Sequence, residues 1–205
     1  MSTYRGPIVR KARRYGAMIF SNGKSKQNAF NKRKYAPGQH GRSSFRSMSE
    51  YAKQLQEKQK ARFMFGLTEK KFRKYYNKAE KTAGITGQEL LKLLERRLDN
   101  VIFRAGLAET RRQARQMSSH GHMLFNGRRV DVPSIEVKVG DTIQVREKLT
   151  KSKLFEEVKA TKKANHPKWL EVDYGKLTIK VIALPDKDDV EVMINSQAIV
   201  EFYSK

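Results

Sequence analysis

The sequence predicts an α+β fold with three parts: a basic extended N-terminal arm, a mainly helical domain and a small inserted α/β module. Three observations predict it. Residues 1–46 contain basic but no acidic residues. Helix-capping signals and apolar residues at helical spacing follow from residue 47, and short alternating runs separated by turn residues follow residue 121. We place the arm at 1–46, the helical domain at 47–93 and the module at 94–171. We expect about 172–205 to complete the helical domain.

The arm combines charge with few aliphatic residues. Twelve Lys or Arg occur up to Arg46, and glycine recurs throughout. Such a segment buries too little apolar surface to fold alone, so we expect it to become ordered on a partner. Its aromatic residues can either stack on bases or pack against the next domain. These residues are Tyr4, Tyr15, Phe20, Phe30, Tyr35 and Phe45.

Helices are predicted at three start signals after the arm. Ser47 with Glu50 has the spacing of a capping box, Thr68 precedes a second helical run, and Thr86 with Glu89 forms another capping box. From Thr86 the apolar residues continue on one helical arc and end before Gly106, which predicts one helix as far as Arg104. The residues on this arc are Leu90, Leu91, Leu94, Leu98, Val101 and Ile102.

A short helix starting near Thr110 is predicted to carry a basic face. At about 100° per residue, Arg111, Arg115 and Arg112 fall within a contiguous arc, opposite Ala114 and Met117. Like charges at this spacing destabilise a helix unless a counter-charge is near, which favours a polyanionic partner. A merely solvated basic face is the alternative.

A tight hairpin follows this helix at Asn126-Gly127. Asn-Gly is the preferred pair for a type I′ turn because both positions need positive φ. The turn fixes the direction of Arg128 and Arg129, so that hairpin and helix could grip one backbone together. Strands are predicted at 122–125, 128–132, 142–146 and 177–184, and a helix at 150–164. We interpret 167–171 as a junction anchored by Trp169, and 194–205 as a short docked helix or strand.

Composition indicates the class of partner. The 205-residue chain has 44 Lys+Arg against 21 Asp+Glu, a formal charge of +23 and a pI near 10.2, values typical of nucleic-acid binding. The sequence contains no run of some 18 apolar residues, so it gives no indication of a membrane partner. Cysteine is absent, which excludes disulfides and Cys-ligated zinc and fits a reducing cytoplasm.

Features that could indicate an enzyme do not form a catalytic constellation. Arg97-Leu-Asp99 is similar to a pseudouridine synthase motif, but we expect its Asp to lie mid-helix with no further catalytic domain. His120-Gly-His122 and 148–152 are similar to synthetase nucleotide signatures, without the strand–helix repeats that such a fold requires. The four histidines lack metal-site spacing, and no phosphate-cradling glycine loop is present. We therefore predict no enzymatic activity.

The motifs together resemble a known family. Arg-Leu-Asp-Asn-Val, Thr-Arg-Arg-Gln-Ala-Arg-Gln, Phe-Asn-Gly-Arg and Val-Gly-Asp-Thr-Ile, between Leu94 and Glu147, resemble the RNA-binding module named after the small-subunit ribosomal protein S4 family. The flanks resemble the bacterial type of that family itself. They are Tyr4-Arg-Gly-Pro7, Tyr35-Ala-Pro-Gly-Gln-His-Gly41, the run 49–60, Pro167-Lys-Trp-Leu-Glu-Val-Asp173 and Ile199-Val-Glu-Phe-Tyr-Ser-Lys205. Only about 176–195 is poorly matched.

The resemblance implies binding to the 5′ domain of the small-subunit rRNA, at a multi-helix junction, as a primary assembly protein. It implies contact with the neighbouring ribosomal protein S5, a contribution to decoding accuracy, and messenger RNA close to Arg42 and Arg46. We expect the protein in the cytoplasmic small ribosomal subunit, with no membrane contact and no homo-oligomer. The alternative is a free-standing RNA-binding chaperone of the heat-shock ribosome-binding type, which has no need of the arm. Many relatives hold zinc through four N-terminal cysteines, which this sequence lacks, so we expect no zinc and no other cofactor.

The resemblance, together with the basic faces described above, implies a set of RNA-binding residues that are basic or polar and fall in three groups. The arm contributes Arg5, Arg10, Arg13, Arg14, Tyr35, His40, Arg42 and Arg46. The first long helix contributes Lys53, Gln54, Lys58 and Arg62. The module contributes Arg111, Arg112, Arg115, Ser119, His120, Asn126, Arg128 and Arg129.

Overall fold

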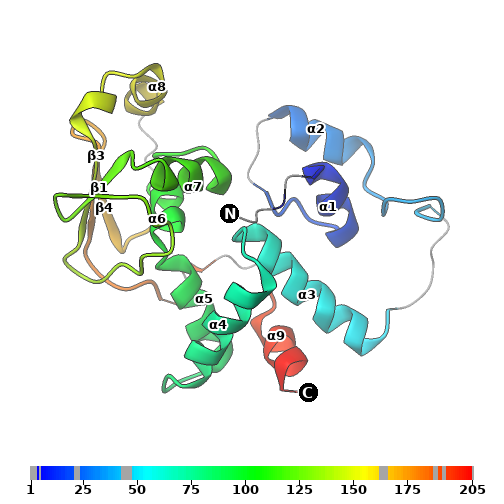
Figure 1. The fold of residues 1–205 in the computed structure, drawn as a ribbon. Helices are drawn as coiled ribbons and strands as arrows, with labels where there is room; N and C mark the ends of the chain where they lie inside the picture. Colours follow the sequence, from blue (N-terminus) through cyan, green and yellow to red (C-terminus); the bar gives the residue numbers. More distant parts are fainter. Residues whose placement is uncertain are drawn as a thin grey trace. The chain divides into compact units, whose positions relative to one another are not determined.

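The computed structural model divides the chain into two units (Figure 1). It describes residues 4, 6–20, 24–42, 48–161, 166–186, 189–190 and 193–204. Unit 1 comprises Met1–Leu90 and Val192–Lys205, and unit 2 comprises Leu91–Glu191. Unit 2 is thus inserted into unit 1, and the chain returns to unit 1 at 192. The reason is that residues 170–181 form two strands of the unit 2 sheet.

Unit 1 is helical. Its helices are α1 Ile8–Tyr15, α2 Lys24–Lys32, α3 Glu50–Met64, α4 Glu69–Glu80, the start of α5 Thr86–Glu95, and α9 Ser196–Tyr203. The expected cap at Ser47 is wrong: Ser49 caps α3 by accepting a hydrogen bond from the Ala52 amide at 3.3 Å, and Ser47 lies outside the described residues. α4 follows Thr68 as predicted. α5 begins at Thr86 itself, so Thr86 lies in the first turn instead of capping it.

The arm has more structure than its composition predicted. It forms α1 and α2 and buries Ala12, Ile19 and Phe30. Tyr4 and Tyr15 lie against the ring of Phe63 in α3, at centroid distances of 5.2 and 6.1 Å. These two tyrosines therefore pack within unit 1, which was one of the two alternatives for the aromatic residues. The expectation that the arm does not fold on its own stays a prediction, because the contacts of these two tyrosines are made to α3, outside the arm.

α9 is joined to α3 and α4 by a cluster around Glu69. Lys58 Nζ and the Tyr203 hydroxyl each donate to Glu69 Oε1 at 2.8 Å. The Lys58 ammonium also lies 4.4 Å from the centre of the Phe202 ring. Burial opposes ionisation of the Glu69 carboxyl, but the hydrogen bonds from Lys58 and Tyr203 outweigh it and lower its pKa below 4.5.

We expect Glu69→Gln to reduce the acid sensitivity of unit 1. A carboxyl whose pKa is lowered by folding stabilises the fold above its ordinary pKa of 4.5, and this contribution is lost as the pH falls through the folded value. The fall in urea midpoint from neutral pH to below 4.5 should be smaller in the variant than in the parent. Glu80→Gln, on the exposed side of α4, is the control and should keep the parental fall. Equal falls in Glu69→Gln and the parent would contradict the role of Glu69.

The helix predicted to run from Thr86 to Arg104 is broken at Arg97. α5 ends at Glu95 and α6 spans Leu98–Arg104. Arg97 has extended backbone (φ −70°, ψ 138°) and forms an antiparallel bridge with Glu136, while the Leu98 amide donates to the Ile135 carbonyl at 2.8 Å. The break follows from these pairings with a distant segment. It moves Asp99 from the expected mid-helix position to the first turn of α6.

Unit 2 is built on an antiparallel sheet in the order β2-β1-β3-β5-β4. Its strands are β1 Met123–Phe125, β2 Arg128–Val130, β3 Thr142–Val145, β4 Leu170–Asp173 and β5 Thr178–Val181. The other elements are α6, α7 Arg111–Ser119, the 3-10 turn η1 Glu147–Leu149 and α8 Lys153–Thr161. The helix predicted at 150–164 corresponds to α8. β4 was not predicted, because the alternation in Leu170-Glu-Val-Asp173 is only four residues long and was interpreted as a junction.

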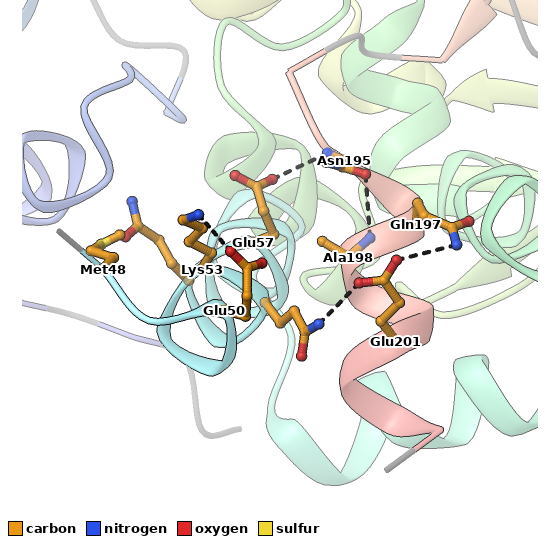
Figure 2. Close-up of a pocket in the computed structure, with 10 residues that line it drawn as sticks. Met48, Glu50, Lys53, Glu57, Asn195, Gln197, Ala198 and Glu201 are labelled. Carbon is orange, nitrogen blue, oxygen red and sulfur yellow. Dashed lines mark hydrogen bonds and ion pairs between the residues drawn. The ribbon is translucent and has the colours of Figure 1, made fainter.

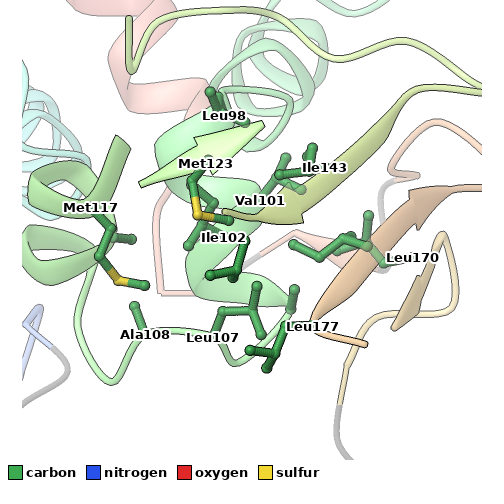
Figure 3. Close-up of a cluster of buried hydrophobic side chains, with 14 of the residues drawn as sticks. Leu98, Val101, Ile102, Leu107, Ala108, Met117, Met123, Ile143, Leu170 and Leu177 are labelled. Atoms are coloured by element: carbon green, nitrogen blue, oxygen red, sulfur yellow. The ribbon is translucent and has the colours of Figure 1, made fainter. Parts of the chain in front are cut away.

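One face of this sheet is covered by the core (Figure 3). Val101 and Ile102 of α6 and Met117 of α7 pack with Met123 of β1 and Ile143 of β3. Trp169 is 2% exposed in the same cluster, which confirms its prediction as a packing anchor. We call the other face, which carries Leu124, Gln144 and Lys180, the open face. It faces away from the core because these residues alternate with buried ones along each strand.

Candidate nucleic-acid interface

α7 carries the basic face that the sequence predicted. Thr110 caps the helix by accepting a hydrogen bond from the Gln113 amide at 3.1 Å. Ala114 and Met117 are buried in the core, and Arg112 is exposed on the opposite side. Arg111 and Arg115 are half-buried at the flanks of this face. The predicted division of α7 into a basic side and a core side is confirmed.

Arg115 is held by a buried carboxylate. Its Nη1 donates to Asp99 Oδ2 at 3.1 Å. Asp99 is 5% exposed and also accepts two hydrogen bonds from Arg97, at 3.1 Å from Nε and 2.9 Å from Nη2. Arg97 itself is 1% exposed, so this carboxylate is shared between one buried and one surface arginine.

Arg111 is held by Asn100, the residue that follows Asp99 in the sequence. Its Nε donates to Asn100 Oδ1 at 2.8 Å, and its guanidinium lies 4.4 Å from the centre of the Phe103 ring. The Asn100 amide donates in turn to Glu95 Oε2 at 2.6 Å. Glu95 is fully buried and accepts hydrogen bonds from Nε and Nη2 of Arg104, each at 2.8 Å, so that Arg104 balances its charge. The sequence did not indicate this network, because its partners occupy α5, α6 and α7.

The hairpin at Asn126-Gly127 has the predicted conformation, with φ of 49° and 79° at the two central residues. The Asn126 side chain joins the turn to β3: it donates to Asp141 Oδ1 at 2.9 Å and accepts from the Thr142 amide at 2.8 Å. Its role in the structure is therefore to hold the turn in place.

Arg128 and Arg129 do not point in the same direction. Arg128 pairs with Phe125 in the register of the sheet and shares the side of the core, whereas Arg129 pairs with Leu124 and lies on the open face. Both are exposed. Successive side chains of a strand point to opposite faces, so the two arginines do not share one face of the sheet, and RNA contact by Arg129 stays a prediction.

Arg129 packs over Gly121, which connects α7 to β1. Gly121 has φ +66°, and a Cβ placed on it would lie 2.5 Å from Arg129 Nε. We expect Gly121→Ala to cost about 1–2 kcal/mol of unfolding free energy, because alanine at positive φ is strained and Arg129 must move. Urea unfolding measures this. Gly175→Ala is the control, since that glycine shows no positive φ and the nearest atom to its Cβ is an Asp173 oxygen at 3.2 Å. Equal losses in both variants would contradict the assignment to Gly121.

Ser119 and His120 lie at the end of α7. Ser119 donates to the Gln116 carbonyl, and His120 is exposed at the C-cap with its ring 5.8 Å from that of His122. Burial, with smaller contributions from His120 and Arg146, lowers the pKa of His122. This shift favours the neutral form of His122.

In the arm, the structure brings together Arg13, Tyr35 and Arg42. Arg13 Nε donates to the Tyr35 carbonyl at 3.0 Å, and the guanidinium groups of Arg13 and Arg42 lie 4.8 and 5.0 Å from the Tyr35 ring centre. A hydrogen bond from Arg42 lowers the pKa of the Tyr35 phenol. Two guanidinium groups on one half-buried ring form a compact cationic surface. Arg10, Arg14 and His40 are exposed, and Arg5 and Arg46 lie outside the described residues.

The expected sites on α3 differ in exposure. Lys53 is exposed and Arg62 is half-buried near Glu69. Lys58 is 5% exposed in its cluster with Glu69, and Gln54 is 6% exposed and donates to Glu201 Oε2 at 2.9 Å. Their burial opposes the expectation that Lys58 and Gln54 contact RNA, because α9 covers both side chains.

A groove between α3 and α9 was missed by the sequence analysis (Figure 2). It has a volume of about 360 Å³, and its lining includes three glutamates and Lys53, which pairs with Glu50 at 2.6 Å. Glu57 accepts a hydrogen bond from the Asn195 amide, and Glu201 accepts from Gln197 as well as from Gln54. Glu50 and Glu57 are seven residues apart, a helical spacing that could have indicated an acidic stripe. The groove is acidic in a chain with a formal charge of +23.

Other classes of site have little support in the described residues. Within that part of the chain, no group of three or more His, Cys, Asp or Glu side chains could hold a metal ion. No helix in the same part is long and apolar enough to cross a membrane.

The whole chain is similar to proteins of one family. Residues 3–95 match the model described as the ribosomal protein S4/S9 N-terminal domain, and residues 96–143 match the S4 domain. Proteins named small ribosomal subunit protein uS4 from Desulfitobacterium hafniense, Persephonella marina and Cutibacterium acnes are 46%, 49% and 50% identical to it over 208 residues. Each alignment covers 100% of both chains.

Proposed function

Since this chain belongs to the family of small ribosomal subunit protein uS4, we propose that it is a structural, non-enzymatic protein of the small ribosomal subunit that binds a multi-helix junction in the 5′ domain of the rRNA early in assembly. The observation that carries this proposal is the basic face of α7, in which Arg111 and Arg115 are hydrogen-bonded to Asn100 and Asp99 of α6. We define the module surface as Arg111, Arg112, Arg115 and Arg128.

The proposed mechanism is recognition of phosphates and shape. The major groove of an RNA helix is deep and narrow, so side chains cannot read bases there, and a rigid basic surface contacts phosphates and 2′-hydroxyls instead. Guanidinium groups suit this role because their planar donors match two phosphate oxygens. The arm adds a second basic surface, in which Arg13 and Arg42 flank Tyr35. Arg42 is the residue that we place near messenger RNA, where it enters the particle.

The acidic groove between α3 and α9 is the candidate face for a protein partner. The lining carries three glutamates against one lysine, Lys53, so its net charge is negative and fits a cationic protein segment better than the phosphates of RNA. We assign it to the neighbouring ribosomal protein S5. Through that contact the protein would contribute to decoding accuracy.

Binding of the purified protein to a transcript of the small-subunit 5′ domain tests the proposal. We expect tight binding that keeps its preference over an unrelated folded RNA at physiological salt, because shape complementarity survives screening. Equal and steeply salt-sensitive binding to both RNAs would contradict the proposal and favour a free-standing RNA chaperone. The family match of residues 3–95, which includes the arm, argues against that alternative.

A further inference from the structure

Two adjacent residues at the start of α6 each hold one arginine of α7. Asp99 accepts from Arg115, and Asn100 accepts from Arg111. Each acceptor thus meets one of the half-buried arginines of the basic face. Asp99 and Asn100 have different further side-chain partners, Arg97 and Glu95.

The acceptors are themselves fixed. Asp99 is held by two hydrogen bonds from the buried Arg97. The amide nitrogen of Asn100 donates to the side chain and to the carbonyl of Glu95, at 2.6 and 3.2 Å. Both residues are at least 95% buried, so neither can turn to follow its arginine. Each arginine is therefore directed by a rigid support in the core.

We propose that Asp99 and Asn100 are positioning residues for RNA binding, which aim the guanidinium groups of Arg115 and Arg111 at neighbouring phosphates. This proposal rests on the proposed function. A free arginine side chain loses rotamer entropy when it binds, and a side chain already held along one edge loses less. Because the supports are built into the core, their contribution to affinity should act only through these two arginines.

If Asp99 and Asn100 only stabilised the fold, their replacement would weaken RNA binding whether or not the arginines are present. A double-mutant cycle therefore separates a positioning role from a purely structural one. We would compare Asn100→Ala, Arg111→Ala and the double variant in binding to the 5′ domain transcript. The same cycle would be run with Asp99→Asn and Arg115→Ala. Arg128→Ala serves as the reference background, since Arg128 belongs to the module surface but is exposed on β2, paired with Phe125 of β1. All affinities are measured well below the melting midpoint of the least stable variant.

In the parent protein, we expect Asn100→Ala to weaken RNA binding several-fold. In the Arg111→Ala background, the same substitution should have almost no further effect. In the Arg128→Ala background its full effect should persist. Equal losses in all three backgrounds, or no loss in the parent, would overturn the positioning role. Asp99→Asn leaves Arg97 buried without its carboxylate, and if that variant does not fold, the Asn100 cycle decides.

The cycle also separates this proposal from the proposed function. Normal binding by Arg111→Ala and Arg115→Ala would show that the RNA site lies elsewhere, and both proposals would fail together. Loss of binding in these arginine variants with normal binding in Asn100→Ala and Asp99→Asn would leave the RNA site in place and overturn only the positioning role.

Discussion

Replacing Arg111 and Arg115 together by alanine is expected to weaken binding to the 5′ domain transcript about a hundredfold. Each guanidinium is assigned a charge-assisted contact with a phosphate, and the loss of one such contact reduces affinity about tenfold. The dependence of log affinity on log salt should also fall by about 1.5, because two phosphates are no longer neutralised. Filter binding across a salt series measures both quantities.

The matched control removes the same charge from the other side of the module. Lys180 lies on the open face of the sheet, between the buried Ile179 and Val181, and Lys176 is exposed in the preceding turn. We expect Lys176→Ala/Lys180→Ala to bind the junction almost as the parent does. Equal losses in the two double variants would show that net charge, rather than the face of α7, determines binding. The melting midpoint of each variant confirms that it is folded.

Replacing Arg97 by methionine is expected to destabilise unit 2 by about 3 kcal/mol. Removing one partner of a buried ion pair leaves the negative charge of the carboxylate insufficiently balanced, and this typically costs about 3–5 kcal/mol of unfolding free energy. Arg115 still donates to Asp99, which places the loss at the lower end. Urea unfolding followed by the fluorescence of Trp169, which is buried in the core of unit 2, measures the free energy of unfolding.

Two further variants show whether the charge of Asp99 is the cause. Arg97→Met/Asp99→Asn should regain part of the loss, because the uncompensated carboxylate is gone. Arg112→Met, on the exposed side of α7, should change the free energy of unfolding by less than about 0.5 kcal/mol. A loss in Arg97→Met as small as that of Arg112→Met would contradict the role of the buried pair.

The residues of α7 and of the hairpin could be predicted because the relevant information is local. A basic arc opposite Ala114 and Met117 follows from 3.6 residues per turn, and positive φ at Asn126 and Gly127 follows from their backbone preferences. Composition likewise indicated a polyanionic partner. Each of these properties depends on contiguous residues or on the whole composition, so the sequence by itself determined them.

Side-chain partners could not be predicted in the same way, because they come from distant segments. Gln54 is buried by Glu201, which lies 147 residues away, and Lys58 by the C-terminal aromatic rings. The family resemblance implied RNA contacts for both, whereas packing of α9 on α3 directs them inward.

The sequence by itself determined the basic arm, the helical domain, the inserted module and the family motifs, because charge, periodicity and turn preferences are properties of neighbouring residues. Only the tertiary structure decided the break at Arg97, the strand β4, the direction of Arg129 and the support of two arginines by Asp99 and Asn100. These features depend on pairings across the fold, such as the bridge of Arg97 to Glu136, and their energy exists only after distant segments have met.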